Sequence, residues 1–310
     1  MFANLFIHDT PGSGIFAVYF FLNSCLMGSG HIYTTGWRTY LNPAELRRSM
    51  IYLWAPLLCF SAFFCWRYFS LHWLIYVPAY AAIWHHIRQS FGIQKWYQRQ
   101  NGVFRKGSDY FTYFLCAVPF LIFHFRDDAQ FNSILFKNDL FSYPNNVLKY
   151  FFYTIYLIGF LGWVIYEVKL LKHKEWNRLG HVALVAFLNA WCFCVGQGEL
   201  GVLFPLVAYH GVAYFAIMSS TLTKTKVNFT VLHAVTIVLL TGLVFGYYER
   251  VIEFKEGLSP SLFWESIWAG IYVTPILSHY IFDAFLWQAK HPEAHLVYGS
   301  KPTLRSAESV

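Results

Sequence analysis

Histidines inside apolar segments are the feature of this sequence that most directly predicts chemistry. His85 and His86 end one apolar run, His210 lies within a second, and His279 and Asp283 lie within a third. Imidazoles and carboxylates are costly to place in hydrocarbon, so their recurrence in such segments indicates a functional site. We expect the four histidines to be metal ligands, and Asp283 to be a further ligand or the group that orients one.

Two spacings support this interpretation. His279 and Asp283 are four residues apart, so both side chains lie on one face of a helix and can serve one ion. Arg88 and Gln89 closely follow the histidine pair. We expect them to hold a substrate head group or to hydrogen-bond a ligand, and the alternative is that they anchor a helix end at the membrane interface.

The composition sets the fold class. The chain has 310 residues, of which 57% are hydrophobic, 21% aromatic and 13% charged. This leaves too little polar surface for a soluble globule of that size. We therefore predict an all-α, polytopic transmembrane bundle, with one membrane domain over residues 1–290 and a short cytoplasmic tail over 291–310. Nine apolar stretches are long enough to span a membrane: 14–31, 50–66, 70–87, 109–125, 149–169, 179–197, 200–219, 228–247 and 263–287.

Basic residues concentrate in every second connecting loop, which predicts the orientation of these spans. Lys and Arg are retained on the cytoplasmic side, so the pattern places the N-terminus outside and the C-terminus in the cytoplasm. His210 then lies near mid-membrane, and the other expected site residues lie in the cytoplasmic half. His31 ends the first span on the same cytoplasmic side. His124 lies at an outer helix end. The net charge of +7 follows from this topology and does not indicate nucleic-acid binding.

The six cysteines predict neither disulfides nor a thiolate metal site. All lie in or beside apolar segments and none has CxxC spacing, so we expect them to be small packing residues. An imidazole-rich site with one carboxylate and no thiolate suits iron used with dioxygen. Apolar walls would bring a lipid chain to such an ion and keep water away from it.

In this combination the chain resembles the histidine-rich integral-membrane iron oxygenases, which include fatty-acid desaturases and hydroxylases and the bacterial Brp/Blh carotene dioxygenases. The resemblance rests on intramembrane histidines on several helices in a chain of suitable size. It concerns architecture, because the desaturase pattern of HxxxH followed by two HxxHH boxes is missing around His85 and His86. It implies one or two non-haem iron ions, a lipid or isoprenoid-like substrate and an electron donor as a partner.

Two other functions remain open. His210 and His279 could be the axial ligands of a b-type haem, with Arg88 beside a propionate, in an electron-transfer protein. Alternatively, Glu199, His210 and the His279/Asp283 pair could form the proton route of a transporter that needs no metal. We favour a non-haem iron oxidoreductase that acts on a lipid at the cytoplasmic leaflet, most simply in a bacterial inner membrane.

Overall fold

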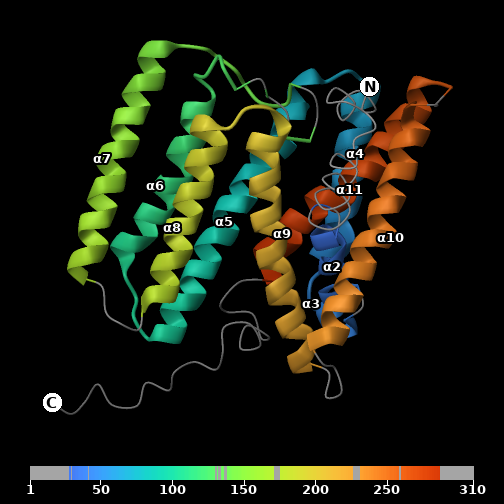
Figure 1. Ribbon diagram of the computed structural model, residues 1–310. Coiled ribbons are helices and arrows are strands. Elements are labelled where there is room, and N and C mark those ends of the chain that lie inside the picture. The colour runs from blue at the N-terminus through green and yellow to red at the C-terminus, as the bar shows by residue number, and fades with distance from the viewer. Residues whose placement is uncertain are drawn as a thin grey trace. The chain divides into compact units, whose positions relative to one another are not determined.

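The computed structural model describes residues 28, 30–40, 42–129, 131, 134–135, 138–170, 175–225, 231–257 and 260–286. These residues form helices and loops, with no strand among them. Two short elements, the 3-10 helix η2 (His72–Ile75) and the π-helical turn η4 (Trp191–Val195), accompany the α-helices. The α-helices are α2 (His31–Arg38), α3 (Pro43–Arg48), α4 (Ile51–Tyr68), α5 (Tyr76–Asn101), α6 (Lys106–Phe123), α7 (Asn146–Leu170), α8 (Trp176–Ala190), α9 (Gly198–Thr225), α10 (Val231–Gly257) and α11 (Leu262–Leu286) (Figure 1).

Five helical segments in the described residues are long and apolar enough to cross a membrane, which indicates a membrane protein. They are Ile51–Tyr68, Asn146–Leu170, Trp176–Val195, Gly201–Met218 and Leu262–Leu286. Helices also cover most of the predicted spans at 70–87, 109–125 and 228–247, whereas most of 14–31 lies outside the described residues. The all-helical fold class is confirmed, and the count of nine spans and their orientation stay predictions.

The segment between the predicted spans at 70–87 and 109–125, which we expected to be a loop, is largely helical. α5 continues without a break to Asn101, well beyond the apolar run. Its polar second half is held against α6, because Gln94 Nε2 donates to Ser108 Oγ at 2.9 Å and Gln98 Nε2 donates to Asp109 Oδ1 at 3.0 Å. A second helix therefore satisfies side chains that, taken alone, indicate a solvated loop.

The chain is organised in two compact units. The first consists of the described residues of Met1–Ile83, Ser133–Leu140 and Val207–Leu286, and the second of those of Trp84–Asn132, Phe141–Leu206 and Trp287–Val310. The predicted tail, 291–310, lies outside the described residues, and the single membrane domain stays a prediction.

In the first unit, α4 packs along α11, and α10 and α2 also contact α11. Phe63, Trp66 and Val273 form a buried core between α4 and α11. Gly270 lets the two helices approach closely, because a Cβ there would lie 2.9 Å from the Phe60 ring. The first unit thus places α2 and α11 side by side, with α10 beside both.

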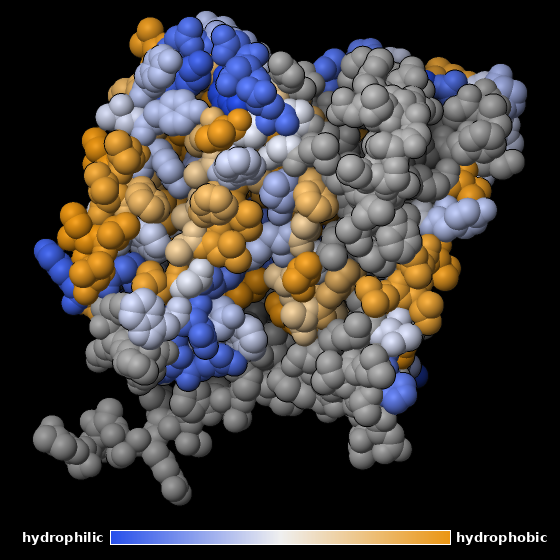
Figure 2. Space-filling model, in the orientation of Figure 1, coloured by the Kyte–Doolittle hydropathy of each residue, from blue (hydrophilic) through white to orange (hydrophobic). Residues whose placement is uncertain are grey.

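In the second unit, α6 packs against α7 and α8 around Leu115, Trp163, Val182 and Ala186. α7 exposes large apolar side chains along its length, including Tyr150 and Phe151. On the side of this unit that carries α7 and α8, Figure 2 shows hydrophobic residues at mid-height, with hydrophilic residues above and below. This distribution is what a membrane protein presents to lipid and to the two aqueous phases.

Buried charges in the second unit are paired. Arg178 is 0% exposed and binds Glu167 in a bidentate fashion, with N–O distances of 2.9 and 2.5 Å. Ser108 Oγ donates to Glu167 at 2.8 Å, and Arg105 donates from Nε to Glu175 at 2.9 Å. These ion pairs join α6, α7 and α8 at one end of the unit, where basic residues are expected at the cytoplasmic surface.

The loop between α6 and α7 carries a further pair. Arg126 Nε donates to Asp128 Oδ1 at 2.9 Å, and this bond holds the pKa of the Asp128 carboxyl below its ordinary value. Arg126 also donates to the backbone carbonyl of Phe193 at 3.1 Å, so the loop is tied to η4.

Candidate metal centre

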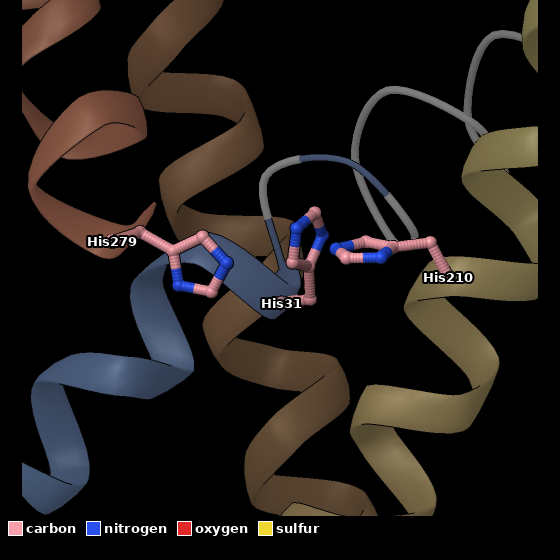
Figure 3. A group of neighbouring side chains, drawn as sticks. All are labelled: His31, His210 and His279. Atoms are coloured by element: carbon pink, nitrogen blue, oxygen red, sulfur yellow. The ribbon is translucent and has the colours of Figure 1, made fainter. Parts of the chain in front are cut away.

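Three buried histidines meet inside the first unit. His31 begins α2, His210 lies in α9 and His279 lies in α11, and their exposed fractions are 5%, 7% and 1%. Figure 3 shows the His31 ring between the other two. The ring centroids of His31 and His210 are 4.6 Å apart, those of His31 and His279 are 5.0 Å apart, and one nitrogen of each ring lies within 4.8 Å of the other two.

Local packing brings His31 to this position. Gly30 precedes it, and a Cβ at Gly30 would lie 2.8 Å from the Phe215 ring of α9 and 3.1 Å from the Cα of Gly242 in α10. A side chain there would force the Phe215 ring or α10 to shift, so the start of α2 lies directly against two neighbouring helices. The helix then presents His31, Thr34, Thr35, Arg38 and Thr39 as a buried polar face.

His279 and Asp283 lie close together on α11, and their roles as ligand and orienting carboxylate stay predictions. Both side chains are buried on one face of α11, and His279 Nε2 lies 3.7 Å from Asp283 Oδ2. Pro275 lies one turn earlier within the same helix. The carboxylate is therefore close enough either to join the histidines around an ion or to orient His279.

A second polar layer lies one turn beyond the histidines. Each histidine is followed after four residues by a polar side chain: Thr35 after His31, Tyr214 after His210 and Asp283 after His279. Thr35 Oγ1 lies 2.5 Å from the Tyr214 hydroxyl, which donates to Asp283 Oδ1 at 3.3 Å. Because the same offset joins the layers on all three helices, α2, α9 and α11 run through the site in the same direction.

His31, Thr35 and Tyr214 were not among the predicted site residues. His31 was placed at the cytoplasmic end of the first span, where a histidine is ordinary, and threonine and tyrosine are common in membrane helices. The available signal was the repeated offset of four residues between a histidine and a polar side chain in three separate segments.

The other predicted site residues lie in the second unit, on α5. His86 is buried, His85 and Gln89 are half-buried, and Arg88 is exposed. The Arg88 guanidinium donates to the Tyr113 hydroxyl and lies over the Phe91 ring, 5.3 Å from its centroid. These contacts suit the interfacial anchor that was the alternative for Arg88, and the ligand roles of His85 and His86 stay predictions.

None of the five described cysteines belongs to the histidine cluster, and all five are free; Cys25 lies outside the described residues. The Glu199 side chain, on which the predicted proton route depends, also lies outside the described part of the chain. His181, by contrast, is a helix-to-helix contact, with Nε2 lying 2.9 Å from the Ser90 carbonyl oxygen of α5.

No family model, curated protein or solved structure matches this chain. The site therefore has to be interpreted from its own geometry.

Proposed function

We propose that this chain is a membrane oxidoreductase whose metal centre is formed by His31, His210 and His279. The observation that carries the proposal is the convergence of three buried imidazoles, from three helices, with ligand nitrogens within 4.8 Å of one another. Three such groups are costly to bury together, and an ion that binds all three offsets that cost.

The donor set fits a single transition-metal ion. Imidazole nitrogens bind such ions at about 2.1 Å, so three nitrogens around one ion lie roughly 3.0–3.4 Å apart. The distances between these nitrogens, up to 4.8 Å, therefore need to shorten by up to roughly 1.4–1.8 Å around an ion, which side-chain rotation can supply. Asp283 Oδ2 lies 3.7 Å from His279 Nε2 and would be a fourth ligand or a neighbouring negative charge.

Iron is the metal that we favour. Several histidines with one carboxylate and open coordination positions are typical of non-haem iron sites that use dioxygen. When bound, the ion would supply the activation of dioxygen for oxidation of a C–H or C=C bond. The chain's own residues would hold the ion, keep bulk water away from it and orient His279 through Thr35, Tyr214 and Asp283.

The arrangement supports a single ion better than a haem. A porphyrin held by His210 and His279 needs the space between the two rings for its own plane, and the His31 ring stands there. A second ion would draw on the other two predicted ligands, His85 and His86.

A lipid is the substrate class that fits the location. His210 lies near the middle of the apolar segment Gly201–Met218, and His279 lies within the apolar segment Leu262–Leu286. A molecule reaching such a centre approaches through hydrocarbon, which favours a fatty-acyl or isoprenoid chain over a solute. Within the same proposal, the protein acts at the cytoplasmic leaflet of a bacterial inner membrane.

The proposal is tested with four variants of the full-length protein. His31→Ala, His210→Ala and His279→Ala should each release iron from purified protein, because each removes one of three ligands. His124→Ala is the matched control: this histidine is half-buried against the Phe120 ring in the second unit and should leave the iron content unchanged. Iron content that is equal in all four variants would overturn the proposal.

Activity is measured as oxygen consumption by iron-loaded protein in liposomes, with fatty acids, phospholipids or carotenoids added in turn. Consumption that needs a reductant indicates a desaturase or hydroxylase, which takes two electrons from a donor. Consumption without a reductant indicates a dioxygenase. Iron-loaded protein that consumes no oxygen with any of the three lipid classes would contradict the proposed substrate.

A further inference from the structure

The Thr35 hydroxyl is the meeting point of the second polar layer. Its oxygen lies 2.6 Å from His279 Nδ1, 2.5 Å from the Tyr214 hydroxyl and 3.5 Å from Asp283 Oδ1. The Tyr214 hydroxyl lies 3.3 Å from the same carboxylate oxygen. All four side chains are buried.

Counting protons determines the direction of these bonds. Thr35 and Tyr214 have one hydroxyl proton each, and an ionised Asp283 can only accept. If Tyr214 donates to Asp283, the Thr35 proton goes to the Tyr214 oxygen. If Thr35 donates to Asp283, the Tyr214 proton goes to Thr35. In both cases Thr35 has no proton left for His279, so the Nδ1 nitrogen must be the donor.

The opposite arrangement is electrostatically poor. If Thr35 donated to His279 Nδ1, its own proton would be used there, and the Tyr214 proton would go to Thr35, because two hydroxyl oxygens 2.5 Å apart need a proton between them. The Tyr214 and Asp283 oxygens would then face each other at 3.3 Å with no proton between them. Two oxygens at that distance in a buried site repel.

We propose that Thr35 and Tyr214, acting with Asp283, hold His279 in the tautomer that is protonated on Nδ1 and leaves its lone pair on Nε2. Thr35 is then a positioning residue for the centre, and this step rests on the proposed function. A neutral imidazole binds a metal through the nitrogen that lacks a proton, and metal-binding histidines commonly donate the other N–H to a polar group. Nε2 is the atom that lies 3.7 Å from Asp283 Oδ2.

The first test reads the tautomer without any metal. Full-length, metal-free protein is labelled with ¹⁵N in its histidines, and the two ring nitrogens of His279 are assigned by comparison with His279→Gln. Protonated and unprotonated ring nitrogens have well-separated ¹⁵N shifts. We expect Nδ1 to carry the proton in the wild type and in Thr35→Ser, and Thr35→Val to give a mixture of tautomers.

Thr39→Val is the matched control. Thr39 caps the C-terminal end of the same helix and is equally buried, and its hydroxyl donates to the Thr35 backbone carbonyl at 3.1 Å, not to a side chain. The same loss of a hydroxyl there should leave the His279 tautomer unchanged. Tyr214→Phe should give a mixture of tautomers, because the Thr35 proton can then go either to Asp283 Oδ1 at 3.5 Å or to His279 Nδ1 at 2.6 Å.

The second test titrates Co²⁺ into metal-free protein and follows its visible absorption. Thr35→Val should weaken binding about 10–100-fold, the usual effect of removing a partner that orients a ligand, and Thr35→Ser should restore it to within a few-fold. Wild-type protein that binds no Co²⁺ would contradict the proposed metal centre, while the ¹⁵N spectrum would still decide the tautomer. A His279 protonated on Nε2 in the wild type, or equal effects of Thr35→Val and Thr39→Val, would overturn the inference.

Discussion

The buried ion pair between Arg178 and Glu167 gives the sharpest prediction about the fold. Arg178 is 0% exposed and Glu167 is 2% exposed, and two N–O contacts at 2.9 and 2.5 Å join them. Arg178→Met removes the cation and leaves the carboxylate buried, with Ser108 still donating to it at 2.8 Å. Breaking a buried pair in this way costs about 3–5 kcal/mol, which corresponds to a fall of roughly 5–10 °C in the unfolding midpoint.

The double variant separates the ion pair from simple packing. Replacing Glu167 with Leu together with Arg178→Met removes both charges of this pair and puts apolar side chains in their place, while the neighbouring Glu175, 3.4 Å from Arg178, keeps its partner Arg105. Such exchanges are often neutral or mildly stabilising, so the double variant should unfold at a higher temperature than either single variant. Lys149→Ala is the control, because its pairing at 3.4 Å with the exposed Asp127 is worth only about 0–1 kcal/mol.

The assay is thermal unfolding in detergent with a thiol-reactive dye. Cys116, Cys192 and Cys194 are free and buried in the same unit as the ion pair, so they react when this unit opens. An Arg178→Met protein with the wild-type midpoint, or a double variant less stable than both single variants, would refute the reasoning.

Three further predictions concern other parts of the chain. Gly30→Ala should destabilise the protein by about 1–3 kcal/mol and weaken metal binding, because the new Cβ would lie 2.8 Å from a phenylalanine ring. Gly36→Ala is the control, because a Cβ at Gly36 meets nothing within 4 Å. The two variants are compared by thermal midpoint and iron content. The hydrogen bond from Arg126 lowers the pKa of Asp128 in the folded protein. The pair therefore stabilises the protein above the ordinary carboxyl pKa and loses that contribution as the pH falls through the lowered pKa. The unfolding midpoint of Asp128→Asn should thus fall less than that of the wild type between about pH 6 and pH 3. Tyr153→Phe should cost about 1 kcal/mol in the same unfolding assay, because it removes a 2.6 Å hydrogen bond to a backbone carbonyl of η4.

Much of the helical framework could be predicted from the sequence, because apolar length directly determines where a chain can span a membrane. A helix break lies close to the predicted boundary between the spans at 179–197 and 200–219: η4 ends at Val195, and α9 begins at Gly198 with a positive φ of 63°. The continuation of α5 to Asn101 could not be predicted in the same way. Its second half is polar, and only the facing α6 supplies partners such as Ser108.

Some residues of the candidate site could be predicted from the sequence, and others could not. His210, His279 and Asp283 stand out because charged or titratable groups inside apolar segments are costly. His31 does not, because its partners come from α9 and α11, far away in the sequence, and because its position depends on the close approach at Gly30. Which side chains from distant segments meet depends on how the helices pack, and the pattern of residues along one segment does not predict that.

The central claim is that three histidines hold an iron ion, and the metal content of the purified wild-type protein tests it most directly. Elemental analysis and an absorption spectrum of one detergent-purified sample are sufficient. The account predicts about one iron per chain, bound by the three imidazoles, and a spectrum without a Soret band. A Soret band would establish a haem instead. Folded protein that contains no metal, and that binds none on reconstitution with iron, copper or zinc, would contradict the account.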